Sequence, residues 1–254
     1  MKKKIFDIIS ALLVISILAF IFIQLSPGDP AENYLRASHL PITDELLKQK
    51  REELGLNSPL IIQYLKWLKN VLLGNFGYSF LRKEPAIYLT FKSLYATFQL
   101  TIFSTFLIIL ISLPIGILSA IKTGTWIDKI VISITTIFVS MPVFWLGFSL
   151  ILLFSVKLNW LPVSGRGGFL NFVLPSITLS VPFIGQYIEF IKKSILENIQ
   201  NKLLENAVLR GLKKRYIISN YLLKGAWIPI LSGFSFTFVS ILTGSILVEE
   251  IFSW

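Results

Sequence analysis

The stretch SLYATFQLTIFSTFLIILISLPIGILSAI, from Ser93 to Ile121, contains 29 residues and not one charged side chain. About 20 apolar residues are enough for a helix to cross the hydrocarbon core of a bilayer. Backbone N–H and C=O groups find no water there, so the segment must satisfy them internally as an α-helix. This stretch therefore predicts a helix that spans a membrane.

Four further runs have the same character and predict four further spans. They extend from Ile5 to Leu25, from Ile130 to Val156, from Phe169 to Ile188 and from Trp227 to Val248. Of these four runs, only the first contains a charged residue, Asp7. Charged residues make up 15% of the 254-residue chain, whereas a soluble domain has about 25%. We therefore expect an all-α fold, a polytopic membrane helix bundle with five spans.

The basic residues indicate which loops face the cytoplasm, because Lys and Arg concentrate there. Lys2, Lys3 and Lys4 precede the first run, which predicts a cytoplasmic N-terminus. On the same threading, eight of the 24 Lys and Arg residues fall in one inner loop between Lys192 and Lys224. The first run lacks a convincing signal-peptide cleavage site and is expected to be retained. Topology thus explains the net charge of +10, and no nucleic-acid partner is expected.

The segment from Ser26 to Lys92 falls outside on this threading and reads as two short helices. Thr43 is the expected N-cap of the first helix. Ser58 is the expected cap of the second, with Pro59 at its first position and Gly74 after its end. We expect residues 1–92 to hold the first span and this helical loop. Residues 93–254 are expected to form the transmembrane core, with a cytoplasmic loop at about 192–226.

Prolines interrupt several of the predicted spans. They stand at Pro114, Pro142, Pro175 and Pro182. Proline removes a backbone hydrogen bond and usually kinks a helix, which suits a bundle that opens around a path, although proline is also simply common in membrane helices. We take Pro142 and Pro182 as candidate pathway or gating residues.

Glu189 is a third candidate for the pathway, because ionisable residues in membrane spans often face one. It lies three residues before Lys192 and four before Lys193. At that spacing it can instead form an ion pair on its own helix. We favour the ion pair.

The sequence carries no sign of an enzyme. No glycine is followed by lysine, so the phosphate-binding pattern of ATPases does not occur, and ATP is not expected to be hydrolysed on this chain. The chain has no cysteine and a single histidine, His39, which predicts no metal site. The spans offer no Ser–His or Asp–Asp pair for intramembrane catalysis. We expect no catalytic residue and no cofactor.

The basic loop contains the stretch ENAVLRGLKKR, Glu205 to Arg215. Before it, Ile195, Ile199 and Leu203 recur every four residues, which predicts an apolar helix face. Gly211 is placed to end that helix in the left-handed conformation. The loop could be an interfacial helix held by anionic lipid, or it could dock on a protein partner.

The longer stretch ENAVLRGLKKRYIISNYLLKGAWIPIL resembles the EAA motif of bacterial ABC importer permeases. Glu205, Ala207, Gly211 and Pro229 match its landmarks, whereas Asn206 departs at its second position. The segments LSPGDPA, ELGLNSPLIIQYLKWL, GNFGYSF, MPVFWLG and LNWLPVSGRGG are also similar to the dipeptide, oligopeptide and nickel permeases, in the same order. The resemblance covers the whole chain.

This resemblance implies a multi-pass subunit in the bacterial cytoplasmic membrane, with the type I importer permease fold. The subunit would form half of a translocation path for peptides or nickel complexes. Its partners would be a second homologous permease, two cytoplasmic ATPases, an extracytoplasmic binding protein and the lipid bilayer. The residues expected to couple to an ATPase are Glu205, Asn206, Ala207, Gly211, Leu212 and Pro229, with a basic rim of Arg210, Lys213, Lys214 and Arg215.

Family members have six spans and continue beyond the position of Trp254 with another one. An alternative expectation is therefore a truncated, transport-defective scaffold or remnant of such a permease. The sequence does not choose among dipeptide, oligopeptide, nickel and metal-chelate substrates.

Overall fold

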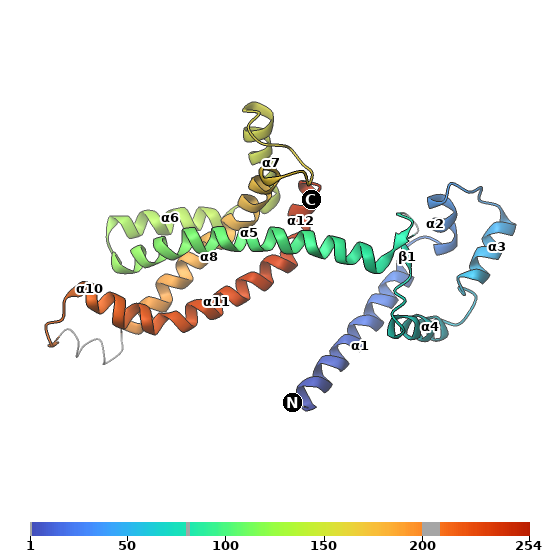
Figure 1. Ribbon diagram of the computed structural model, residues 1–254, viewed down its shortest axis with the longest axis horizontal. Coiled ribbons are helices and arrows are strands. Elements are labelled where there is room, and N and C mark those ends of the chain that lie inside the picture. The colour runs from blue at the N-terminus through green and yellow to red at the C-terminus, as the bar shows by residue number, and fades with distance from the viewer. Residues whose placement is uncertain (1, 80–81, 200–208) are drawn as a thin grey trace. The chain divides into compact units, whose positions relative to one another are not determined.

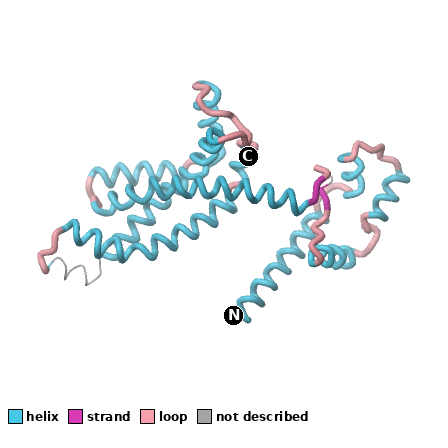
Figure 2. Tube along the Cα trace, viewed as in Figure 1, coloured by secondary structure: helices cyan, strands magenta, loops and turns pink. Residues whose placement is uncertain are grey.

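The computed structural model describes residues 2–79, 82–199 and 209–254 (Figure 1). The chain divides into two compact units, Met1–Lys92 and Ser93–Trp254. Helices make up most of both units (Figure 2). Each unit is described by itself below.

The first unit contains four helices and a short hairpin. These elements are α1 (Lys2–Leu25), α2 (Pro30–Ala37), α3 (Asp44–Glu53), α4 (Leu60–Leu72), β1 (Tyr78–Ser79) and β2 (Glu84–Pro85). Thr43 caps α3 as predicted, since its hydroxyl oxygen accepts a hydrogen bond from the Leu46 N–H at 3.4 Å. The prediction for α4 is one residue off, because Pro59 occupies the N-cap position and Ser58 makes no capping bond. The helix α2 and the hairpin were not predicted.

Polar contacts hold the first unit together. Asp29 caps α2 and forms an ion pair with Arg51 of α3 at 2.6 Å. The Tyr64 hydroxyl of α4 lies 2.8 Å from the Ser16 hydroxyl of α1. Because Ser16 lies within an apolar span, this bond fixes α4 alongside the C-terminal half of α1.

The second unit is built around one long helix, α8. Its elements are α5 (Ala86–Ile121, whose first residues belong to the first unit), α6 (Trp126–Ser140), α7 (Val143–Leu150), the π-helix η1 (Ile151–Lys157), α8 (Phe169–Ile199), α10 (Lys214–Ile217), the π-helix η2 (Ile218–Leu222), α11 (Leu223–Gly244) and α12 (Ile246–Ile251). Helices α6, α7, α11 and α12 pack against α8. Ile184, Ile188, Ile191 and Ile195 recur along its buried side.

Glycine allows two of these helices to approach α8 closely. A Cβ atom on Gly185 of α8 would lie 2.9 Å from the Thr135 carbonyl oxygen of α6. A Cβ atom on Gly233 of α11 would lie 2.5 Å from the Phe190 ring of α8. Helices in lipid associate through such close contact between small residues, because the lipid tails are as apolar as the side chains.

The structure confirms the all-α membrane bundle. Four of the described helices are long and apolar enough to span a membrane: Lys3–Leu25, Ala86–Ile121, Phe169–Glu197 and Ile218–Gly244. A fifth span is present if α6 and the helix Val143–Lys157 are counted together, and these meet at an angle of 96°. The span predicted from Ile130 to Val156 therefore consists of two helices that meet at a sharp bend.

The break lies at Pro142, and its cause is local. Met141 is extended, with φ −72° and ψ 124°, which is the conformation that a following proline imposes. Pro114, Pro175, Pro182 and Pro229 lie inside helices that continue past them. Of the four prolines proposed as kinks, only Pro142 stands at a break between helices.

The close approach at Gly185 predicts a packing defect on substitution. Gly185→Ala places a methyl group against a backbone oxygen, which cannot move aside as a flexible side chain would. Overpacking of this kind costs about 1–3 kcal/mol. We expect a lower apparent Tm for the purified protein in detergent.

Gly244→Ala is the matched control, because nothing lies within 4 Å of the added Cβ atom at this helical glycine. Its Tm is expected to equal or exceed that of the wild type, since alanine favours a helix over glycine. Equal Tm values for the two variants would contradict the close contact between α6 and α8.

Candidate functional site

The structure describes the predicted coupling segment up to Ile199, at the end of α8, and again from Leu209, just before α10. Glu205, Asn206 and Ala207 lie outside the described residues. Gly211 has a φ of +70°, the left-handed conformation predicted for it, and nothing lies within 4 Å of where its Cβ atom would be. A residue with a side chain is strained at this φ.

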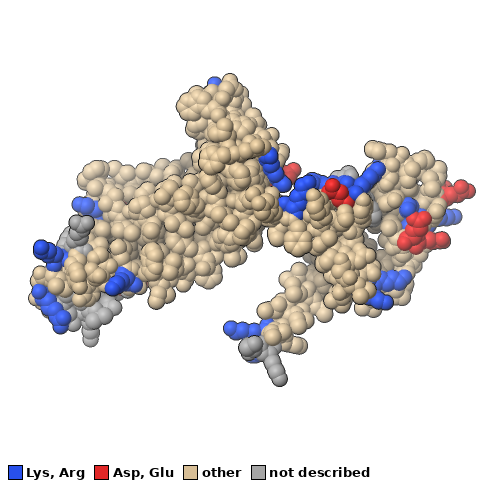
Figure 3. Space-filling model, viewed as in Figure 1, with Lys and Arg blue, Asp and Glu red and all other residues tan. Residues whose placement is uncertain are grey.

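The basic rim lies at the same end of the second unit. Arg210 and Lys213 are exposed, and Leu212 between them is half-buried. Lys214 and Arg215 open the short helix α10. Figure 3 shows basic side chains gathered at this end, while most of the body of the unit carries no charge.

Pro229 is not at this end. It lies inside α11 on an exposed face. The chain is helical from Lys214 to Pro229, so the two residues are about 22 Å apart at 1.5 Å per residue. The structure thus separates Pro229 from the other described members of the predicted motif.

The two ends of the coupling segment meet against the end of α5. An apolar cavity of about 150 Å³ lies between them. It is lined by Ile117, Ala120, Ile121, Ile195, Ile218, Leu222 and Leu223. Apolar contacts with α5 thus hold α8 and η2 where the segment leaves and re-enters the bundle.

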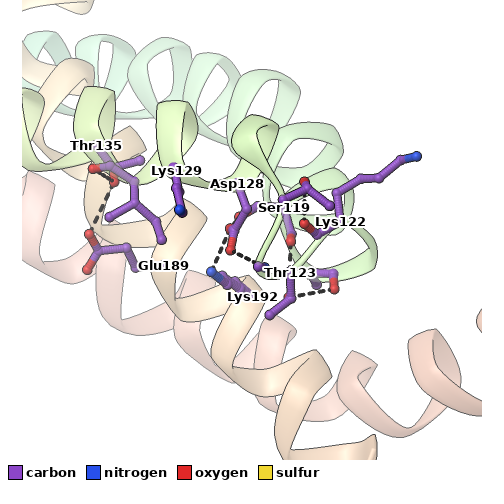
Figure 4. A network of polar contacts seen from close by, with 12 residues as sticks. Ser119, Lys122, Thr123, Asp128, Lys129, Thr135, Glu189 and Lys192 are labelled. Carbon is purple, nitrogen blue, oxygen red and sulfur yellow. Dashed lines mark hydrogen bonds and ion pairs between the residues drawn. The ribbon is translucent and has the colours of Figure 1, made fainter.

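A buried ion pair joins α6 and α8 (Figure 4). The Lys192 ammonium of α8 donates to Asp128 Oδ1 of α6 at 2.6 Å. The side chains of Asp128 and Lys192 are 5% and 15% exposed. The Ser119 hydroxyl also donates to Asp128 Oδ1, at 2.5 Å, and the Gly124 N–H donates to Oδ2 at 3.0 Å. The carboxylate therefore accepts three hydrogen bonds, and its burial is compensated.

The local sequence explains how Asp128 is placed. Gly124, with a φ of +81°, closes the turn between α5 and α6. Asp128 lies in the first turn of α6, where a negative charge is favoured by the helix dipole. Its carboxylate reaches back to the Gly124 N–H, which precedes the helix and has no intrahelical partner. The turn and the first helical residues thus direct the carboxylate toward α8.

The favoured interpretation of Glu189 is wrong. Its carboxylate accepts a hydrogen bond from the Thr135 hydroxyl of α6 at 3.1 Å, and no ion pair of Glu189 occurs among the residues that the structure describes. Lys192 pairs with Asp128, and Lys193 pairs with Glu197 at 3.9 Å. Glu189 therefore makes a second polar link between α6 and α8.

The two candidate pathway prolines lie away from this network. Pro142 lines an open groove of about 480 Å³ at the break between α6 and α7, together with Ser140, Met141 and Trp145. Pro182 is buried within α8. Neither proline contacts the Asp128–Lys192 pair.

The ion pair was not predicted, although the sequence contains a signal for it. Asp128 is the only acidic residue between Glu84 and Glu189. Starting the third span at Ile130 assigned Asp128 to a solvated loop, whereas α6 begins at Trp126. An ionisable residue in the first turn of a span is therefore a candidate for a buried partner.

Comparison with known proteins agrees with this architecture. Residues 112–254 match the family described as binding-protein-dependent transport system inner membrane component. Residues 1–102 match the N-terminal family of the same transport system membrane components. The chain belongs to this family. It is a multi-pass permease component of ABC transporters, found in the inner membrane.

Several curated relatives resemble the permease over nearly its whole length. A probable peptide ABC transporter permease of Sinorhizobium fredii is 30% identical, over 99% of this chain and 82% of that protein. A glutathione transport system permease of Pectobacterium atrosepticum is 32% identical, over 99% of this chain and 81% of that protein. The corresponding protein of Salmonella typhimurium is 31% identical with the same coverage.

The buried ion pair of the permease predicts a large loss of stability when only one partner is removed. Lys192→Met leaves the Asp128 carboxylate buried without its counter-charge. Such a change costs about 3–5 kcal/mol. We expect a strongly lowered Tm and a reduced yield of monodisperse protein in detergent.

Lys193→Met is the control, because the Lys193 side chain is 77% exposed and pairs with an exposed carboxylate. An exposed pair contributes about 0–1 kcal/mol. The exchange of the two partners, Asp128→Lys with Lys192→Asp, is also expected to lower the Tm. The Gly124 N–H would then face an ammonium group. A fully stable exchanged protein would contradict the geometry around Asp128.

Proposed function

We propose that this permease forms half of the translocation path of an ATP-driven importer of peptides, a class that includes glutathione. The observation that carries the proposal is the similarity of 99% of the chain to permeases named for peptide and glutathione transport. The other half of the path would be a second homologous permease. An extracytoplasmic binding protein would deliver the substrate.

The energy would come from two cytoplasmic ATPases, since the sequence has no phosphate-binding pattern of its own. The segment at about 192–226 would dock on an ATPase, with the N-terminus of the chain on the same side of the membrane. The exposed residues Arg210, Gly211 and Lys213 at this end of the second unit support this placement. Glu205, Asn206, Ala207, Leu212, Lys214 and Arg215 would complete the docking surface.

The two parts of the chain would divide the work. Residues 1–92 would supply the first span and an extracytoplasmic helical loop, and residues 93–254 the path and the coupling segment. Pro142, at the break between α6 and α7, is the proline best placed to act in gating, because an open groove lies beside it. Pro182 and Glu189 would line or support the path.

The conformation of Gly211 predicts a docking defect. Gly211→Val puts a β-branched residue at a φ of +70°, which is a strained position for any side chain. We expect the ATPases to be lost when the permease is purified from membranes in mild detergent. Insertion of the permease into the membrane is expected to be unchanged.

Gly74→Val is the matched control. Gly74 has a φ of +83° with nothing within 4 Å of its Cβ position, so the strain is similar, but it lies in the first unit after α4. The ATPases are expected to co-purify with the Gly74→Val variant at the wild-type level. Recovery of ATPases with the Gly211 variant at that level would refute the docking assignment.

The substrate class is tested by uptake. Cells that lack the permease are complemented with this chain, alongside its partner subunits, and supplied with labelled dipeptides, glutathione or Ni²⁺. We expect restored uptake of peptides or glutathione. Uptake of Ni²⁺ alone would reassign the substrate. Background uptake of all three from an assembled complex would favour the transport-defective scaffold.

A further inference from the structure

We infer that the Asp128–Lys192 ion pair is the joint through which the coupling segment moves the α5–α6 hairpin. Asp128 and Lys192 are then positioning residues of the transport cycle. This inference rests on the proposed function, because it assumes that an ATPase displaces the coupling segment.

The pair connects the two parts that such a joint must connect. Lys192 lies where the coupling segment begins, on a helix that continues without a break from Phe169 to Ile199. Ser119, Gly124 and Asp128 belong to the end of α5, the turn and the start of α6. A displacement of the end of α8 therefore reaches the hairpin directly through the ion pair.

Neighbouring contacts make this region act as one body. Ile191, next to Lys192, packs against α5 so closely that a Cβ atom on Gly116 would lie 2.8 Å from the Ile191 Cβ atom. One turn earlier on α8, Glu189 accepts the hydrogen bond from Thr135 of α6. The end of α8 is thus fixed to both helices of the hairpin at adjacent levels.

The contacts of the same end of α8 with the return of the chain have a different character. Ile195 faces Ile218, Leu222 and Leu223 across the apolar cavity of about 150 Å³. A polar link from α8 to α11 lies farther from this end on both helices, where the Tyr187 hydroxyl donates to the Ile230 carbonyl. Apolar contact has no preferred direction, whereas the ion pair to the hairpin is directional.

The first experiment measures the coupling of transport to ATP hydrolysis. The complete importer, with both permeases, the ATPases and the binding protein, is reconstituted in proteoliposomes. The quantity measured is the labelled dipeptide or glutathione transported per ATP hydrolysed. Lys192→Met and Asp128→Asn are expected to lower this ratio on the order of tenfold, an ordinary size for coupling between sites. Lys192→Arg, which keeps the charge, is expected to restore most of it.

Lys129→Met is the matched control, because Lys129 is exposed and adjacent to Asp128 on α6. Its ratio is expected to equal that of the wild type. An unchanged ratio in an assembled Lys192→Met complex overturns the inference. If the wild type neither assembles with ATPases nor transports, the proposed function fails instead, and the two failures are thereby distinguished.

The main comparison of a second measurement is made with the ion pair intact and so does not depend on the stability of the neutralised variants. The chain has no cysteine, so spin labels can be attached through Lys122→Cys and Lys193→Cys, one in the α5–α6 turn and one on α8. The distance between the labels is expected to be the same in the nucleotide-free and vanadate-trapped importer. A shift on trapping, with the ion pair intact, overturns the inference. With Asp128→Asn added, we expect the distance distribution to broaden or shift on trapping.

Discussion

Close packing around α8 is the constraint on which the rest of the second unit depends. Hydrophobic burial does not hold helices together in lipid, because the lipid tails are as apolar as the side chains. Close packing between helices, which small residues allow, contributes instead. Gly116 of α5 and Gly233 of α11 face the Ile191 and Phe190 side chains of α8, and Gly185 of α8 faces the α6 backbone. Three helices therefore approach α8 at positions where no Cβ atom intervenes.

This packing determines where polar side chains can meet. Gly116 admits Ile191, which sets the level of α8 against α5 and brings Lys192 next to the turn that carries Asp128. Burial of the two charges is costly unless every group is satisfied. The Ser119 hydroxyl and the Gly124 N–H meet that requirement. The polar network is thus a consequence of the apolar packing around it.

The spans could be predicted because a charge is costly in hydrocarbon, and a long run without charged residues is visible in the sequence. The break in the third span could not, because Pro114, Pro142, Pro175 and Pro182 have the same local chemistry, and neighbouring helices decide which of them ends a helix. The ion pair joins residues 64 positions apart. The spacing of residues within one helix gives no information about a partner at that separation. Glu189 was expected to pair with a lysine on its own helix because the i, i+3 and i, i+4 spacings can be read from the sequence. Its actual partner, Thr135, lies on another helix, and the sequence does not show that the two residues are neighbours.

An ion pair at this position needs a reason other than stability. A buried pair can often be replaced by apolar residues of similar volume without loss of stability. Apolar side chains that replaced Asp128 and Lys192 could slide past each other, and small sliding of packed helices is a common form of protein motion. A carboxylate that accepts three hydrogen bonds from α5, the turn and α8 allows one arrangement only. Such a contact suits the proposed coupling, because work that arrived at one end of α8 would be lost wherever the helices slid.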